Sequence, residues 1–241
     1  MINKSTDPYV FDTDEKGMIA LTEKNVKFVS AILSIDSTYK AAETGLTGSA
    51  QELFHTYGIT TERELLTQQV KALNKENSTH LYVADGLNLT VERIMSISNL
   101  KERLIKRDET IVKEIASAVP GRNNFSFATK YCTFACRYSL DKPYDDGYCI
   151  YDKVLEQTIP YYAWRFLREK HIKRTQSTLR ETIAEKRDYK RYIDLIDRII
   201  NASAEEIDYK ISHKDFDHLL WYCYKGDEKQ RVSLIAKKIN S

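Results

Sequence analysis

Apolar residues recur at helical spacing, three and four positions apart, along most of the chain. The segment "TEKNVKFVSAILSI" is the first example. The next, "SAQELFHTYG", begins with Ser49 as a cap, has Glu52 three residues later and stops at Gly58. In "TERELLTQQVKALNKEN", Thr61 and Glu64 repeat the capping pattern. These three segments predict three helices.

The middle of the chain continues the pattern. Thr90 predicts the cap of a short helix that ends at Ile97. The stretch "LKERLIKRDETIVKEIASAV" predicts one long amphipathic helix, which Pro120 and Gly121 end. The apolar and aromatic segment 125–138 predicts the next helix.

The last third is helical in pattern as well. We expect "YDKVLEQTIPYYAWRFLREKHIK" to form a helix that is broken or kinked near Pro160. Two more helices are predicted in "TLRETIAEKRDYKRYIDLIDRIINA" and "HKDFDHLLWYCYKG", and another in segment 227–239. Residues 1–20 carry Asp, Gly, Pro and Ser without apolar periodicity, and predict an irregular arm.

Together these segments predict an all-α fold of roughly ten helices. We expect one helical domain over residues 1–241, arranged as two lobes around a cleft. Composition agrees, because eight Gly and four Pro are few for a sheet-rich protein with many tight turns. The formal net charge is +2, so a nucleic-acid surface must be a local patch.

The spacing of the cysteines and the hydropathy of the chain indicate the compartment in which the protein resides. The four cysteines contain no CxxC pair, and the first residues lack the apolar core of a secretion signal. We therefore expect a cytoplasmic protein with reduced thiols. No apolar run approaches the roughly 20 residues of a membrane-spanning helix. The cysteines and histidines form no ligand pattern, and we expect no metal and no cofactor.

Lys130 lies in the middle of the aromatic segment 125–138. On a helix it shares a face with Ser126, Phe127, Thr133 and Phe134. An ammonium group among such neighbours loses hydration, which favours the neutral amine that a nucleophile needs. A lysine whose stem lies on apolar surface while its head reaches water is the ordinary alternative.

Asp152 follows Lys130 by 22 positions and stands at the predicted start of a helix. A carboxylate there caps free backbone N–H groups and stays ionised. It can also stabilise a cationic sugar in a transition state or orient an attacking water.

This part of the chain resembles the helix-hairpin-helix superfamily of DNA glycosylases, and within it the branch similar to 8-oxoguanine DNA glycosylase. The resemblance is carried by "IVKEIASAVPG", "FATKYCTFACRYSLDKP" and "CIYDKVL", within the segment 101–160. "DFDHLLWYCYKG" resembles the closing helix of bacterial relatives. The hairpin is divergent, because "PGRNNFS" has no second glycine.

The resemblance implies base excision from double-stranded DNA with a flipped base. Lys130 takes the place of the nucleophile and Asp152 that of the electrostatic or general-base partner, with possible abasic-site lyase activity. The substrate would be a damaged base, or a modified base on invading DNA, in repair or antiphage defence. We expect a monomer that does not bind membranes.

Two sets of residues are candidates for contacts with DNA. Arg122, Asn123 and Asn124 form the hairpin, where polar side chains can contact phosphates. The stretch "YYAWRFLREKHIKR" adds Arg165, Arg168 and Lys173 beside aromatic residues. A solvated helix face with its aromatics in the core explains this second set equally well.

Two other functions remain open. The spacing of Arg165 and His171 loosely resembles the signature of HEPN-type helical ribonucleases, in which an Arg and a His lie a few residues apart on a helix. A non-catalytic, nucleic-acid-binding helical protein is the second alternative.

Overall fold

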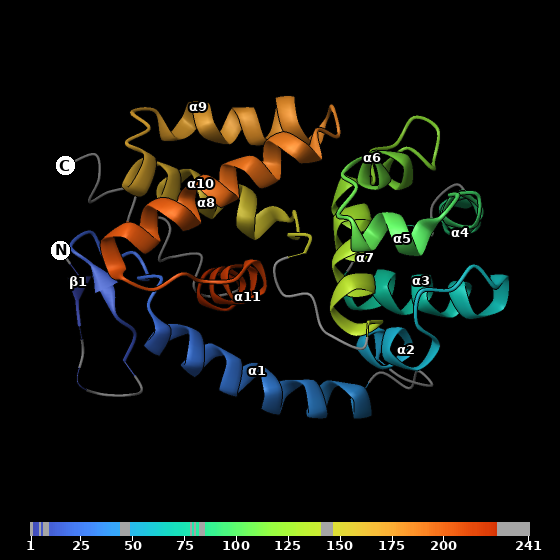
Figure 1. Cartoon of the computed structure of the whole chain (residues 1–241), viewed down its shortest axis with the longest axis horizontal. Coiled ribbons are helices and arrows are strands. Elements are labelled where there is room, and N and C mark those ends of the chain that lie inside the picture. The colour runs from blue at the N-terminus through green and yellow to red at the C-terminus, as the bar shows by residue number, and fades with distance from the viewer. Residues whose placement is uncertain are drawn as a thin grey trace. The chain divides into compact units, whose positions relative to one another are not determined.

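A computed structural model of the chain describes residues 2–4, 6, 10–43, 49–77, 79, 81, 85–140 and 147–225. These residues confirm the all-α prediction (Figure 1). Their helices are α1 (Glu23–Glu43), α2 (Ala50–Tyr57), α3 (Arg63–Asn77), α4 (Gly86–Met95), α5 (Leu100–Ile105), α6 (Thr110–Ala116), α7 (Phe125–Tyr138), α8 (Lys153–Leu167), α9 (Ile172–Ser177), the π-helical η2 (Thr178–Ala184), α10 (Tyr189–Ile207) and α11 (His213–Tyr224). The helix predicted over 227–239 lies outside the described residues.

The chain divides into two compact units, and each gathers segments that are distant in sequence. Unit 1 contains Met1–Ser37, Asp152–Ser177 and Asp194–Ser241, and unit 2 contains Thr38–Tyr151 and Thr178–Ile193. The arrangement as one domain of two lobes around a cleft stays a prediction.

Helix α7 is the central helix of unit 2. It packs against α2, α3, α5 and α6, which lie above, to the right of and below it in Figure 1. Most of its residues are buried, on every side of the helix. A helix of this kind forms a core rather than a solvated face. The predicted bounds, 125–138, are confirmed.

Unit 1 is organised around α8, which packs against α9 and α11. The Tyr162 hydroxyl, on α8, donates to the Ile19 carbonyl oxygen at 2.8 Å, and the Ile19 N–H donates to the Tyr224 hydroxyl of α11 at 3.1 Å. The N-terminal segment is therefore fixed to two helices of its unit.

That N-terminal segment is more ordered than the irregular arm predicted for residues 1–20. It contains two short antiparallel strands, β1 (Ile2–Asn3) and β2 (Thr13–Asp14), with Ile2 opposite Asp14. Residues 18–21 are buried. Apolar periodicity missed it because a two-residue strand is too short to show alternation.

Two of the predicted caps differ in outcome. The capping box of α2 is confirmed, since the Ser49 hydroxyl accepts from the Glu52 N–H and the Glu52 side chain accepts from the Ser49 N–H. The cap at Thr90 is wrong. Helix α4 begins at Gly86, and the Thr90 hydroxyl donates to the Gly86 carbonyl oxygen inside the helix at 2.6 Å. A Ser or Thr side chain satisfied in this way gives no sign of a helix start.

The single long helix expected before Pro120 is also wrong, because α5 and α6 are separate. Between them the Asp108 carboxylate accepts from the Thr110 N–H at 2.9 Å and pairs with Arg103 at 2.7 Å. Burial alone would raise the pKa of Asp108, but hydrogen bonds from the Thr110 hydroxyl, Arg103 and the Thr110 N–H together hold it below its ordinary value. Asp108 thus supplies the local hydrogen bond that competes with helix continuation.

Two further differences concern the last third. Helix α8 continues through Pro160, so the predicted break is wrong, whereas the alternative of a kink there stays a prediction. The segment 178–184 is π-helical rather than the start of a long α-helix. None of the described helices combines the length and apolar character that crossing a membrane requires.

Candidate functional site

Helix α7 is entered through a tight turn after α6. Gly121 has φ +72°, and the Asn124 N–H donates to the Ala116 carbonyl oxygen at 3.2 Å. A positive φ strains any residue that carries a Cβ atom, which explains the glycine. The turn therefore reverses the chain and directs it into Phe125, the first residue of α7.

We expect Gly121→Ala to lower the free energy of unfolding by about 1 kcal/mol through this strain. Space is not the cause, because nothing lies within 4 Å of the position that a Cβ atom would take. Urea denaturation measures the change. Gly121→Asn is the matched variant and should cost less, because Asn tolerates positive φ. Equal stability of Gly121→Ala and wild type would contradict the strained turn.

Lys130 is enclosed in the middle of α7. Its residue surface is 6% exposed, and its helix neighbours Phe127 and Thr133 are fully buried. Such a position has lost most of the water that normally solvates a lysine head. The sequence-based expectation that Lys130 sits among apolar neighbours agrees with this burial.

Two threonines on α7 hold a second segment of unit 2 against the helix. The Thr133 hydroxyl donates to the Tyr148 carbonyl oxygen at 3.2 Å, and the Tyr151 N–H donates to the Thr129 hydroxyl at 3.0 Å. Segment 148–151 therefore runs along the helix that carries Lys130. Sequence reasoning missed this role, although two threonines one turn apart in an apolar helix were the available signal.

Aromatic residues of α10 hold the same segment from another direction. The Cys149 N–H donates to the Tyr189 hydroxyl at 2.6 Å, and the Tyr192 hydroxyl donates to the Ile150 carbonyl oxygen at 2.5 Å. Phe125 packs edge-on against Tyr151, with 5.2 Å between ring centroids. The backbone that leads to Asp152 is thus fixed by hydrogen bonds at several successive residues.

Asp152 is the N-cap of α8, as predicted. Its Oδ1 accepts from the Leu155 N–H at 2.9 Å. Within the described part of the chain, Oδ2 has no hydrogen-bond partner. Asp152 is the first residue of the second segment of unit 1, whereas Lys130 and Tyr151 belong to unit 2. Whether Lys130 and Asp152 face each other across a cleft stays a prediction.

The hairpin residues differ in which of their hydrogen-bonding groups remain available to a ligand. The Asn123 amide donates to the Ala184 carbonyl oxygen at 2.5 Å and accepts from the Phe125 N–H at 3.1 Å. Asn124 is buried. By contrast, the backbone N–H groups of Gly121 and Asn123 have no partner among the described residues. The spare donors of this hairpin are therefore these two backbone groups and the buried Asn124 amide, whose Nδ2 has no hydrogen-bond partner among the described residues.

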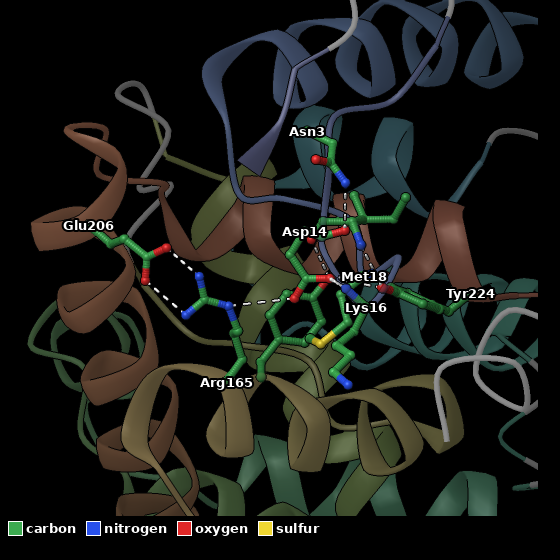
Figure 2. Close-up of polar contacts among 9 residues, drawn as sticks. Asn3, Asp14, Lys16, Met18, Arg165, Glu206 and Tyr224 are labelled. Atoms are coloured by element: carbon green, nitrogen blue, oxygen red, sulfur yellow. Dashed lines mark hydrogen bonds and ion pairs between the residues drawn. The ribbon is translucent and has the colours of Figure 1, made fainter. Parts of the chain in front are cut away.

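Three cations on and after α8 were predicted to contact DNA. One of them is paired with carboxylates and the other two are exposed. Arg165 makes two bonds with the Glu206 carboxylate, one of them 2.8 Å from Nη1 to Oε2, and its Nε lies 3.5 Å from Oδ2 of Asp14 (Figure 2). Two carboxylates thus already surround the Arg165 guanidinium. Arg168 and Lys173 are exposed.

A small pocket of unit 1 lies beside this cluster. It is lined by the polar groups of Asp14, Arg165 and Glu206 and by apolar residues of β1, α8, α10 and segment 18–20. Two carboxylates against one guanidinium give it a negative balance, which disfavours an anion. The pocket is therefore unsuited to a phosphate.

We expect Arg165→Met to lower the free energy of unfolding by about 2 kcal/mol, because it leaves the buried Asp14 carboxylate without its cation. The figure is below that of a fully buried pair, since the Arg165 and Glu206 side chains are 20% and 38% exposed. Arg168→Met, on an exposed residue, is the control and should change stability by less than about 0.5 kcal/mol. Equal effects in chemical denaturation would contradict a structural role for Arg165.

The ribonuclease alternative needs Arg165 and His171 on one helix. Helix α8 ends at Leu167, Arg168 has φ +56°, and His171 precedes α9. The two residues therefore do not share a helix, and Arg165 is already paired with Glu206.

The four cysteines are buried free thiols. Burial raises the pKa of Cys136 to about 12 and also raises that of Cys132. In the described part of the chain, no group of three or more His, Cys, Asp or Glu is placed to hold a metal ion.

These thiols are expected to resist Ellman's reagent at pH 8 in the native protein, because the thiolate is the reactive form and burial disfavours it. The same sample in concentrated urea should release the signal of four thiols. Rapid reaction of two or more thiols without denaturant would contradict the burial of these four cysteines.

Comparison with known proteins gives one match. A family model described as "HI_0787_N: N-terminal domain" matches residues 35–139, which are fewer than half of the 241 residues. The matched part contains Lys130 and ends before Asp152. No curated protein matches the chain, and no solved structure does either.

Proposed function

We propose that the protein is a DNA glycosylase that excises a damaged or modified base, with Lys130 as nucleophile and Asp152 as its partner. The observation that carries the proposal is the enclosure of Lys130, 6% exposed, at the centre of a helix that follows a glycine turn. The binding of segment 148–151 to α7 adds support, because Tyr151 is joined covalently to Asp152.

The chemistry requires a neutral amine. The burial of Lys130 keeps bulk water away from its side chain, which supports its assignment as the nucleophile. Its Nζ would form a bond to the anomeric carbon of the flipped nucleotide as the N-glycosidic bond breaks, and the base would leave with a proton. Opening of the sugar ring then gives a Schiff base, from which strand cleavage at the abasic site can follow.

Asp152 would act on the same sugar. One of its oxygens caps α8 and so fixes the carboxylate, while the other has no partner among the described residues. A fixed negative charge next to the anomeric carbon stabilises the cationic character that develops there. This arrangement supports an electrostatic role, or the orientation of a water molecule.

Contacts with DNA are proposed at the hairpin and after α8. The spare N–H groups of Gly121 and Asn123 can donate to a phosphate, as can the exposed cations Arg168 and Lys173. Arg165 contributes less, because Glu206 and Asp14 surround it. The proposed partner is duplex DNA with one base flipped out, bound by a monomer.

Borohydride trapping tests the proposal. Purified protein is incubated with duplex oligonucleotides that carry oxidised, alkylated, deaminated or hypermodified bases, or an abasic site, together with sodium borohydride. We expect a covalent complex with at least one of these duplexes. Duplex binding without trapping or base release would favour a non-catalytic DNA-binding protein. RNA cleavage that requires His171 would favour the ribonuclease.

A further inference from the structure

We infer that unit 2 carries a second phosphate-binding segment, 185–191, which joins the hairpin to form one surface for the backbone of duplex DNA. We call residues 120–124 and 185–191 the hairpin–turn surface. The inference rests on the proposed function for the identity of the partner, and on the contacts of unit 2 for its position.

Two hydrogen bonds bring these segments together. The Asn123 side chain donates to the Ala184 carbonyl oxygen at 2.5 Å, and Arg187 Nη2 donates to the Arg122 carbonyl oxygen at 3.0 Å. Residues separated by more than 60 positions in sequence thus lie side by side. The hairpin is therefore not an isolated turn but half of a two-segment surface.

The charge of the hairpin–turn surface is positive. Its cations are Arg122, Lys186, Arg187, Lys190 and Arg191, and its acids are Glu185 and Asp188. One of the acids is used locally, because Asp188 Oδ1 accepts from the Arg191 N–H at 3.1 Å. The net charge of the whole chain is only +2, so this is a local concentration of positive charge.

The cations of this surface have different roles. Lys186 and Arg191 are exposed, and their side chains have no hydrogen bond or ion pair within the described residues. Lys190 is 3.9 Å from Glu109 at the start of α6, which offsets part of its charge. Lys186 and Arg191 are thus the side chains that can reach a phosphate.

Arg187 positions the turn. Its φ is +56°, and its guanidinium holds the hairpin through the Arg122 carbonyl. Its Nε is buried without a hydrogen-bond partner among the described residues. Because this atom has no surface that solvent can reach, Arg187 contributes its charge and its bond to the hairpin rather than a direct contact from Nε.

The spare backbone donors of the hairpin fit the same ligand. The N–H groups of Gly121 and Asn123 lack partners among the described residues, and no atom outside residues 120–122 lies within 4 Å of the position for a Cβ atom on Gly121. A phosphate can therefore approach the turn closely. Backbone donors beside flexible cations position a duplex without reading its sequence.

Charge reversal tests the inference. In Lys186→Glu/Arg191→Glu, we expect affinity for a 20-base-pair duplex to fall about tenfold or more near 100 mM salt. The slope of log affinity against log salt should become shallower by about two, one for each lost phosphate contact. Fluorescence anisotropy over a series of salt concentrations measures both quantities.

The matched control is Lys71→Glu/Lys75→Glu, which changes net charge equally through two exposed lysines of α3 in the same unit. We expect it to keep the wild-type slope. An unchanged slope in Lys186→Glu/Arg191→Glu, or an equal change in the control, would overturn the inference. Preferential binding of duplex RNA, lost in the same variant, would overturn DNA as the partner.

Trapping separates this inference from the proposed chemistry. With DNA at saturating concentration, Lys186→Glu/Arg191→Glu should still form the covalent complex, because Lys130 is intact. If wild type gives no trapped complex but the variant loses salt-dependent binding, the glycosylase proposal fails and the surface stands. If trapping occurs and binding is unchanged in the variant, the surface fails and the glycosylase proposal stands.

Discussion

Lys130→Met is expected to abolish the borohydride-trapped complex and to lower base release by at least about 10³-fold, because no amine remains to form the Schiff base. Methionine is the suitable replacement, since it fills a similar length of buried space without a charge. A smaller residue would add the cost of a cavity in a central helix. Gel electrophoresis of the reduced complex and single-turnover base release measure the two effects.

Two controls accompany this variant. Lys113→Met removes an exposed lysine from α6, and its trapping should equal that of wild type. Circular dichroism and thermal unfolding show whether Lys130→Met is folded. Trapping in folded Lys130→Met at the wild-type level would remove Lys130 from the mechanism.

Asp152→Asn is expected to slow base release by about 10²-fold or more, while the protein stays nearly as stable as wild type. Asparagine is as good an N-cap as aspartate, so α8 keeps its first hydrogen bond from the Leu155 N–H. The negative charge is lost, and with it the stabilisation of the cationic sugar. Single-turnover rates and melting temperatures together separate the two roles of this residue.

Asp152→Ala completes the comparison, because it removes both the charge and the cap. We expect its rate to be as low as that of Asp152→Asn and its stability to be lower by about 1 kcal/mol. If Asp152→Asn released the base at a rate near that of wild type, the role of Asp152 would be that of a helix cap alone.

Local sequence pattern predicted the helices whose ends are set by nearby side chains. The capping box at Ser49 fixed α2, and Asp152 fixed the start of α8. Thr90 misled the prediction because its hydroxyl bonds within the helix, as an interior threonine can. Asp108 separates α5 from α6 through bonds to Thr110 and Arg103, whereas the apolar periodicity continues across it.

In the candidate site, too, features set by nearby residues were predictable and features set by residues distant in sequence were not. The apolar setting of Lys130 and the cap at Asp152 follow from residues within a few positions of each. The partners of Arg165 do not, because Asp14 and Glu206 lie far from it in sequence and meet it only in the folded unit. The contact between Arg187 and the hairpin is likewise a product of the fold. Spacing alone predicts neither.

Mapping the covalent adduct identifies the residue that attacks the sugar. The complex trapped with borohydride is digested with nuclease and protease, and the modified peptide is sequenced by mass spectrometry. We expect a secondary amine that joins the sugar remnant to Nζ of Lys130. An adduct on another lysine or on the N-terminal amine, with Lys130 unmodified, would contradict it.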